Sequence, residues 1–213
     1  MQTEILSAEQ VAVLDRLKAV PLVGEFYLAG GTALALRHGH RRSIDFDFFR
    51  KDTFDAEALV SFLETTFGTL DRLPSGEYTV HVRLFGVSAS FFRLPYPLLA
   101  APEPTPWGFG TATDADIAAM KLEAIAGRGS RKDFVDLWLL CRLGMSLEEV
   151  FAFFEQKYGV RRTEFYHRLR ALSYFEDAEQ QPMPDMAIEC DWAEVRSFFT
   201  SEAARLLAKG MGD

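Results

Sequence analysis

Asp45 and Asp47 lie two residues apart in a run of strand-forming residues. Successive side chains of a β-strand point to opposite faces, so both carboxylates would share one face of the strand. The apolar side chains of Ile44, Phe46 and Phe48 would share the other face. At about 3.3 Å per residue the two carboxylates would be roughly 7 Å apart. Two like charges at this separation require solvent or a hard cation such as Mg²⁺, so the pair predicts a strand with a solvated or metal-binding face.

A second motif precedes the acidic strand. Gly30, Gly31 and Thr32 follow the short apolar run 26–29 and come before the apolar run 33–36, which favours a turn from a strand into a helix. Glycine at such a turn allows the backbone to approach a phosphate, and the start of a helix offers N–H groups that have no partner within the helix. A phosphate-binding turn next to a metal-binding Asp-x-Asp strand indicates nucleotide chemistry.

Each motif also has a simpler interpretation. The Gly-Gly pair alone is typical of an ordinary loop, and an Asp-x-Asp pair alone is typical of a solvated face of an edge strand. The combination of both motifs in one short β-α-β-like unit, with apolar residues alternating around the two acids, favours the functional interpretation.

The composition limits the classes of protein to consider. The chain has 213 residues and is 48% hydrophobic with 19 Phe, which is enough for a real core in one large or two small domains. Cys141 and Cys190 show neither zinc-ligand nor disulfide-framework spacing. The first residues lack a signal-peptide pattern and no stretch approaches a membrane span, so we expect a cytoplasmic protein without a membrane partner.

The charge distribution bears on nucleic-acid binding. A net charge of −8 argues against a broad nucleic-acid surface, which is normally basic. Arg37, Arg41 and Arg42 are a local exception, because they lead directly into the Asp pair. We expect them to contact RNA if RNA is a substrate, or otherwise to solvate a loop or pair with the two aspartates.

The order of the elements predicts an α+β fold, with an N-terminal α/β half joined to a C-terminal helical half. Ser7 and Gln10 form a capping-box pattern for a helix over 8–19, and Asp55 caps a helix over 56–67 that ends at Gly68. Alternating residues at 78–84 and 87–93 predict a hairpin with a Phe85-Gly86 turn. Five prolines predict a stiff connector over 95–110. The remaining helices are expected at 114–127, 131–143, 146–158, 162–175 and 191–209.

The helical half carries a second charged group. Lys121 and Arg128 are seven residues apart and share one helical face, while Asp133 and Asp136 share a face of the next helix. Lysine and arginine suit phosphate oxygens. Ser130-x-x-Asp133 is also a capping-box pattern, which explains Asp133 without chemistry. Asp136 has no such explanation, so we expect either an ion pair with Lys121 or Arg128, or a catalytic role.

Taken together, these residues resemble the AbiEii/MenT family of nucleotidyltransferase-like toxins from bacterial toxin–antitoxin and abortive-infection systems. The matching segments are 30–32, 45–47, 92–99, 120–122, Arg128 and 132–137. The resemblance implies a nucleotidyltransferase-like small mixed sheet flanked by helices over 1–100, followed by a helical half over 101–213 that closes the nucleotide cleft. It also implies transfer of a nucleoside monophosphate from an NTP, with tRNA 3′ ends as acceptors in some members, and a cognate antitoxin as partner.

The resemblance implies roles for individual residues. Gly30, Gly31 and Thr32 would bind the triphosphate, and Asp45 and Asp47 would hold Mg²⁺ as catalytic residues. In the helical half, Lys121 would be catalytic and would bind the nucleotide together with Arg128. Asp136 would be a catalytic acid that orients Lys121 or a metal-bound water.

The chain departs from the wider nucleotidyltransferase pattern at one place. Such enzymes usually carry a third carboxylate on a neighbouring strand, whereas the corresponding hairpin strand here has Ser88 and Ser90. A hydroxyl is a poor Mg²⁺ ligand compared with a carboxylate, which argues against a full two-metal mechanism. Two alternatives therefore stay open. One is a catalytically silent nucleotide- or partner-binding protein of the same fold, and the other is a transferase for a small hydroxylated molecule.

Overall fold

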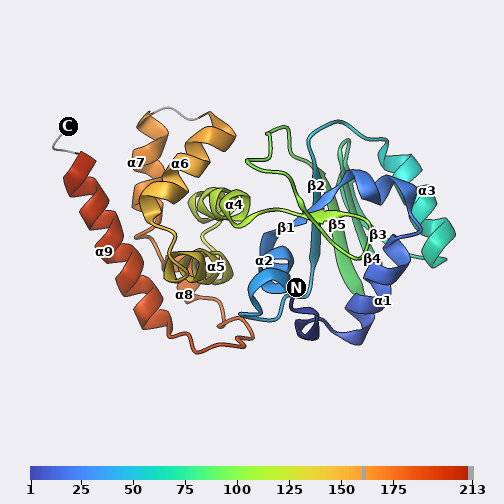
Figure 1. Ribbon diagram of the computed structural model, residues 1–213, viewed down its shortest axis with the longest axis horizontal. Helices are drawn as coiled ribbons and strands as arrows, with labels where there is room; N and C mark the ends of the chain where they lie inside the picture. The colour runs from blue at the N-terminus through green and yellow to red at the C-terminus, as the bar shows by residue number, and fades with distance from the viewer. Residues whose placement is uncertain (160–161, 211–213) are drawn as a thin grey trace. The chain divides into compact units, whose positions relative to one another are not determined.

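The computed structural model describes residues 1–159 and 162–210. The chain divides into two compact units, Met1–Thr113 and Asp114–Asp213 (Figure 1). The sequence predicted the division after residue 100. The first unit extends further because two short strands in the proline-rich segment join its sheet.

The first unit is built on a seven-stranded mixed sheet in the order β3-β4-β5-β2-β1-β7-β6. Strand β2 pairs in parallel with β5, as β1 does with β7, and the other pairs are antiparallel. This confirms the predicted small mixed sheet and the predicted hairpin of β4 and β5. The strands are β1 (Tyr27–Ala29), β2 (Phe46–Arg50), β3 (Asp71–Gly76), β4 (Thr79–Leu84), β5 (Val87–Arg93), β6 (Glu103–Pro104) and β7 (Gly110–Thr111).

Strand β2 begins two residues later than the sequence pattern suggested, at Phe46 and not at Ile44. Asp45 lies directly before the strand, whereas Asp47 lies within it. Phe46 and Phe48 are fully buried as predicted, but Ile44 is 74% exposed, so its placement on the core face was wrong. The physical reason is that residues 42–45 are not paired in the sheet, so the alternation of faces does not extend to Ile44.

Three α-helices accompany this sheet: α1 (Ala8–Leu17), α2 (Gly30–His38) and α3 (Ala56–Phe67). The predicted capping box of α1 is confirmed, because the Ser7 hydroxyl accepts from the Gln10 N–H and the Gln10 side chain accepts from the Ser7 N–H. Asp55 caps α3 as predicted, by accepting from the Ala58 N–H. Helices α1 and α3 cover the face of the sheet that carries the buried side chains (Figure 1).

Two features of the first unit were not predicted. The segment 95–110 is not only a connector, because it contains β6 and β7, and these strands extend the sheet beyond β1. They have two residues each, too few to show an alternating pattern. Short 3₁₀ helices at Thr3–Ile5 and Pro21–Glu25 were also missed.

The second unit is helical in the part of the chain that the structure describes. Its helices are α4 (Asp114–Gly127), α5 (Arg131–Arg142), α6 (Leu147–Tyr158), α7 (Arg162–Ala171), α8 (Glu176–Glu179) and α9 (Trp192–Gly210). The prediction of one helix over 162–175 was too long, because a turn at Ser173 and Tyr174 separates α7 from α8. Phe134, Trp138 and Phe199 form a large part of the buried core.

Two further observations concern buried charge and hydropathy. Lys157 of α6 and Asp116 of α4 are fully buried and 2.7 Å apart, so they form an ion pair that joins two core helices. Within the described residues, no helix is both long enough and apolar enough to cross a membrane.

Candidate active site

The turn from β1 into α2 places the backbone against the acidic strand. Gly30 is the first residue of α2 and has a φ of +67°, a conformation that residues with a Cβ rarely adopt. A Cβ on Gly30 would lie 2.9 Å from Oδ2 of Asp47. The glycine therefore allows the start of the helix and the carboxylate to be in direct proximity, as the combination of motifs predicted.

Gly31 is also required by close packing. A Cβ at this position would collide with the guanidinium group of Arg41 and would approach the hydroxyl of Ser43 at 3.2 Å. The Arg41 side chain is buried, with 3% of its surface exposed, and its Nη1 donates to the carbonyl of Arg42. Arg41 therefore lies over the glycine turn, and of the alternatives given for it, the one in which it solvates a loop was wrong.

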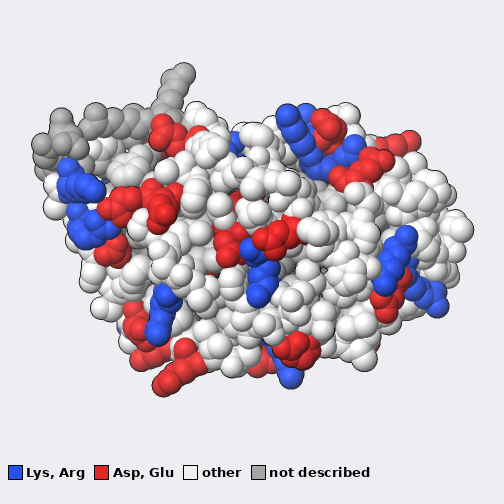
Figure 2. Space-filling view, in the orientation of Figure 1, with Lys and Arg blue, Asp and Glu red and all other residues white. Residues whose placement is uncertain are grey.

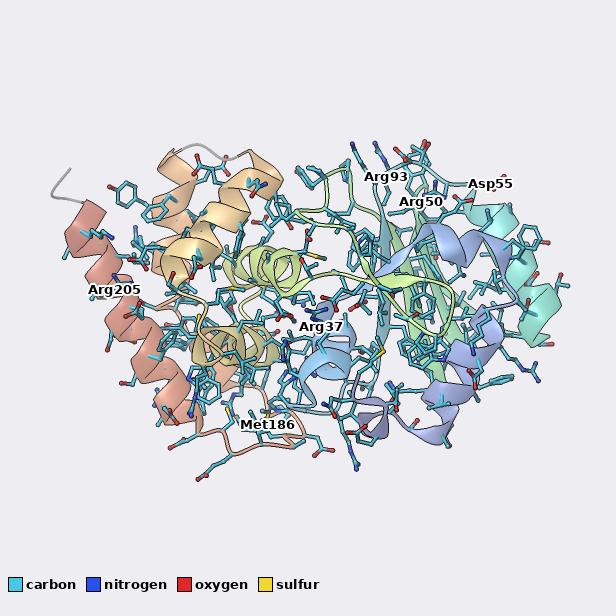
Figure 3. The ribbon with its side chains drawn as sticks, in the orientation of Figure 1. Arg37, Arg50, Asp55, Arg93, Met186 and Arg205 are labelled. Carbon is cyan, nitrogen blue, oxygen red and sulfur yellow. The ribbon has the colours of Figure 1, made fainter. Side chains whose placement is uncertain are left out.

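The predicted basic surface is correspondingly reduced. Arg37, in the last turn of α2, forms an ion pair with Glu103 (labelled Arg37 in Figure 3), and Arg42 is exposed. Figure 2 shows basic and acidic side chains interspersed over the visible face. This surface does not form one extended basic patch.

Thr32 connects the turn to the acidic strand. Its side chain is buried, and its hydroxyl donates to the backbone carbonyl of Asp45. The contact holds the residue before β2 against α2. The side chain of Thr32 therefore positions Asp45, and the groups of this turn that could reach a phosphate are backbone N–H groups. In the part of the chain that the structure describes, no side chain caps α2 at Ala29.

The face of the sheet opposite α1 and α3, called the open face below, carries a polar row beside Asp47. Asp47 of β2 is paired with Ser90 of β5, and Ser90 is paired with His81 of β4. Nδ1 of His81 lies 2.8 Å from the hydroxyl of Ser90. The three side chains share the face opposite the buried core residues of their strands. Ser90 was noticed in the sequence as a missing acid, but His81 was not recognised.

Aromatic side chains lie next to this row. Phe49 of β2 stacks on Phe92 of β5 with ring centroids 5.1 Å apart, and Phe92 meets the edge of the His81 ring at 5.3 Å. Phe49 and Phe92 are half-buried, whereas Tyr27, which stacks on Phe49, is buried. This face therefore carries two half-buried aromatic rings, stacked on each other, one step along the strands from Asp47 and Ser90.

The donor set of the acidic strand is small. Within the described residues, no cluster of three or more His, Cys, Asp or Glu residues could hold a metal ion. Mg²⁺ is usually bound by one or two carboxylates together with substrate phosphates and water. Asp45 and Asp47 beside the start of α2 fit this kind of site, in which the substrate completes the ligand set.

In the second unit, the predicted charged residues converge on one buried network. Nζ of Lys121 lies 2.8 Å from Oδ1 of Asp133 and 2.6 Å from Oδ2 of Asp136. Nε of Arg128 lies 2.8 Å from Oδ2 of Asp133, and the Ser130 hydroxyl donates to the same carboxylate. The predicted ion pair between Lys121 and Asp136 is therefore present. Asp133 is contacted by Lys121, Arg128 and Ser130.

This arrangement revises the interpretation of Asp133 as a simple cap. The Ser130 hydroxyl bonds to the carboxylate of Asp133 and not to a backbone N–H of α5. Burial raises the pKa of Asp133, but the charges of Lys121 and Arg128 and their hydrogen bonds outweigh it and hold the pKa well below its ordinary value. Asp133 is therefore a buried, ionised acid.

The two cations of the network differ in access to solvent. The Lys121 side chain is 5% exposed, whereas the Arg128 side chain is 62% exposed. An incoming phosphate can reach the guanidinium of Arg128 without displacing its contact to Asp133. Lys121 would first have to leave two buried carboxylates.

The first unit also contains a pocket of about 350 Å³ at the end of β2. Its lining includes the basic residues Arg50 and Lys51, the acidic residues Glu25 and Asp52, and Tyr96. Arg50 forms an ion pair with Glu25 and is the register partner of Arg93 (Figure 3). The pocket is therefore polar, of mixed charge, and large enough for a small molecule.

Comparison with known protein families agrees with this geometry. A family model described as nucleotidyl transferase AbiEii toxin, type IV toxin–antitoxin system, matches residues 12–81 and 79–206. The protein aq_aa25 of Aquifex aeolicus (strain VF5) is 41% identical over 208 residues, which cover 95% of this chain and 98% of that protein.

Two solved structures share the fold. JHP933 from Helicobacter pylori has a TM-score of 0.55 at 16% identity, covering 96% of this chain and 94% of that chain. MenT4, the nucleotidyltransferase toxin Rv2826c from Mycobacterium tuberculosis H37Rv, has a TM-score of 0.55 at 19% identity, covering 93% of this chain and 85% of that chain. The predicted nucleotidyltransferase-like fold is confirmed.

Proposed function

The chain belongs to the AbiEii family of nucleotidyltransferase toxins, and we propose that it transfers a nucleoside monophosphate from an NTP to a hydroxyl group of RNA, with Mg²⁺ held by Asp45 and Asp47. Membership of this type IV toxin–antitoxin family makes the protein a nucleotidyltransferase toxin and implies a nucleotide substrate and an antitoxin partner. The observation that best supports the proposal is the left-handed Gly30, whose Cβ would lie 2.9 Å from the Asp47 carboxylate.

The residues of the first unit would have separate roles in binding the triphosphate and the metal ion. Backbone N–H groups at the start of α2, at Gly31 and Thr32, would donate to the triphosphate, favoured by the positive end of the helix dipole. Asp45 and Asp47 would hold Mg²⁺, which when bound neutralises phosphate charge and aligns an acceptor hydroxyl with the α-phosphorus. The Thr32 hydroxyl would keep Asp45 in place through its backbone carbonyl.

In the second unit we propose that Arg128 contacts the nucleotide phosphates, because its guanidinium is exposed while it remains bonded to Asp133. Lys121 and Asp136 would then act by fixing helices α4 and α5 around this arginine. This changes the emphasis of the sequence prediction, in which Lys121 and Asp136 were themselves catalytic.

RNA is the proposed acceptor, with tRNA 3′ ends as the first candidate. Phe49 and Phe92 are half-buried and lie on the face of the sheet that carries Asp47. Aromatic side chains at a binding face favour contact with unpaired bases. An unpaired RNA end needs only a small contact area, which is compatible with a net charge of −8.

A small hydroxylated molecule is the second candidate acceptor. The mixed-charge pocket of about 350 Å³ beside Arg50, Lys51 and Tyr96 favours it, because such a pocket suits a compact polar ligand better than a polyanion. The two candidates share the nucleotide chemistry and differ only in the acceptor.

Label transfer from α-labelled NTPs tests the proposal. Each of the four NTPs is incubated with Mg²⁺ and total RNA or total tRNA, and the products are separated by size. We expect labelled RNA with the unmodified protein and none with Asp47→Asn, and a melting curve shows whether this variant is folded. Asp177→Asn, which replaces an exposed aspartate of α8, is the matched control and should retain transfer.

Three outcomes would contradict parts of the proposal. Full activity of Asp47→Asn would exclude the metal role of Asp47. Label that appears only in small products would favour the second acceptor. Absence of transfer from every NTP to RNA, protein and small-molecule extracts would favour a catalytically silent protein.

A further inference from the structure

Nucleotidyl transfer requires the acceptor hydroxyl to lose a proton as its oxygen attacks the α-phosphorus. Asp45 and Asp47, as metal ligands, are not available as bases. Histidine is suited to this task, because it is the side chain whose ordinary pKa allows it to gain and lose a proton between pH 5 and 8. The open face of the sheet carries a histidine close to this position.

His81 is connected to the metal strand through one side chain. Ser90 is the register partner of Asp47 on one side and of His81 on the other. Adjacent strands are about 4.8 Å apart, so the Ser90 hydroxyl is one strand from the Asp47 carboxylate and His81 is two strands away. The Ser90 hydroxyl lies 2.8 Å from Nδ1 of His81, and the edge contact with Phe92 fixes the plane of the imidazole ring.

We propose that Ser90 and His81 form a proton-accepting pair for the acceptor hydroxyl, an inference that rests on the proposed nucleotidyl transfer at Asp45 and Asp47. Ser90 contacts the acceptor hydroxyl, and His81 acts through Ser90. The pair uses a hydroxyl and an imidazole on the strands beside Asp47.

The transfer step balances with these two residues. The acceptor oxygen forms a bond to the α-phosphorus and the bond from that phosphorus to the bridging oxygen breaks, which releases pyrophosphate. The proton of the acceptor hydroxyl moves to Oγ of Ser90 while the proton of Ser90 moves to Nδ1 of His81. Ser90 stays neutral, and the imidazolium of His81 later releases its proton to solvent.

Side chains of both charges lie near His81. Its neighbours on the same face are Thr79 and Arg83 on β4, Leu73 on β3 and Ser90 on β5. The charged groups on this face are Arg83 and its register partner Asp71, one pair along the strands, and Asp47 beyond Ser90. One cation and two carboxylates thus surround the ring, and the unprotonated Nδ1 of a neutral imidazole can accept a proton.

Kinetics of His81→Gln and Ser90→Ala test the pair, with label transfer from an α-labelled NTP to total RNA as the reaction. Each substitution should lower kcat by about a hundredfold or more, the usual contribution of a general base, with little change in KM for the NTP. The double variant should be no slower than either single variant, because the two residues act as one unit. Ser90→Thr keeps the hydroxyl and should keep most of the activity.

The pH profile separates a chemical role from a structural one. In the unmodified protein kcat should depend on pH through the general base, and this dependence should be absent in His81→Gln. His167→Gln, which replaces an exposed histidine in α7, is the matched control and should keep both the rate and the profile. Melting curves and NTP binding show whether each variant is folded.

The outcomes distinguish this inference from the proposed function. If Asp47→Asn is inactive while folded His81→Gln keeps full kcat or an unchanged pH profile, the proton-accepting pair is refuted and nucleotidyl transfer stands. If the effects of His81→Gln and Ser90→Ala multiply in the double variant, the relay is also refuted. If Asp47→Asn keeps full activity, or the unmodified protein transfers no label, the proposed function fails and the pair fails with it.

Discussion

Replacing Lys121 by Met tests whether the charged network of the second unit is a structural element. Lys121, Arg128, Asp133 and Asp136 carry two positive and two negative charges, and the variant removes one of the positive charges. Both aspartates have fully buried side chains, and Lys121 Nζ lies within 2.8 Å of each. Removal of one partner of a buried ion pair costs about 3–5 kcal/mol, and we expect this loss in the free energy of unfolding.

Urea unfolding followed by tryptophan fluorescence measures this loss. The second unit contains Trp138 and Trp192, and a Trp107→Phe background removes the tryptophan of the first unit. Lys132→Met, which removes an exposed lysine of α5, is the matched control and should change stability by at most about 0.5 kcal/mol. Replacing Lys121 and Asp136 together by apolar residues of similar size should recover at least half of the loss.

The pH dependence of the free energy of unfolding should have the opposite sign in Lys121→Met. In the unmodified protein the pKa of Asp133 is below its ordinary value of 3.8, so its contribution to stability is present above pH 3.8 and is lost as the pH falls through the lower, folded-state pKa. Without Lys121, the pKa of Asp133 is raised by burial and is no longer lowered by the lysine charge. The variant should therefore gain stability relative to the unmodified protein as the pH falls from 7 towards 5.

Two results would refute this reasoning. The first is a loss of less than about 1 kcal/mol at pH 7, which would mean that the buried carboxylates do not depend on Lys121. The second is a marked loss of NTP affinity in folded Lys121→Met, because a side chain that is 5% exposed should contribute little to nucleotide binding.

Two further predictions concern the glycine turn. Gly30→Ala forces a left-handed conformation on a residue with a Cβ and brings that Cβ to 2.9 Å from a carboxylate oxygen. It should therefore lower the free energy of unfolding by about 1–2 kcal/mol and impair label transfer. If a melting curve and the transfer assay show neither effect, the close approach of Gly30 to Asp47 is contradicted. Thr32→Val removes the buried hydroxyl that donates to the Asp45 carbonyl and should cost about 1–3 kcal/mol in urea unfolding, whereas Thr32→Ser should keep most of the stability; equal losses for Val and Ser would show that the hydroxyl is not the stabilising group.

The sequence predicted those parts of the fold that depend on neighbouring residues. The capping box of Ser7 and Gln10 and the cap at Asp55 were recognised because each hydrogen bond joins residues three positions apart. The strands β6 and β7 were missed because their formation depends on β1, which precedes them by more than 70 residues. A two-residue strand has no pattern of its own.

In the candidate site, too, contacts between residues distant in the sequence were not predicted. The sequence assigned Asp133 to a cap because Ser130 precedes it by three residues, and that contact does exist between the two side chains. Its ion pair with Lys121 joins two helices whose packing is not encoded in any local spacing. Burial of Arg41 against Gly31 was missed for the same reason, because a run of basic residues alone predicts a solvated surface.

Part of the arrangement around His81 could have been predicted from the sequence. The two-residue turn at Phe85 and Gly86 places Leu84 opposite Val87, and the same register places His81 opposite Ser90. A histidine facing a serine on a half-buried face could therefore have been found from the predicted hairpin alone. The parallel pairing of Ser90 with Asp47 could not, because the two strands are separated by about 40 residues of chain and only the assembled sheet sets their register. That pairing brings the imidazole within one side chain of the proposed metal site, so the chemistry depends on the part of the register that the turn does not determine.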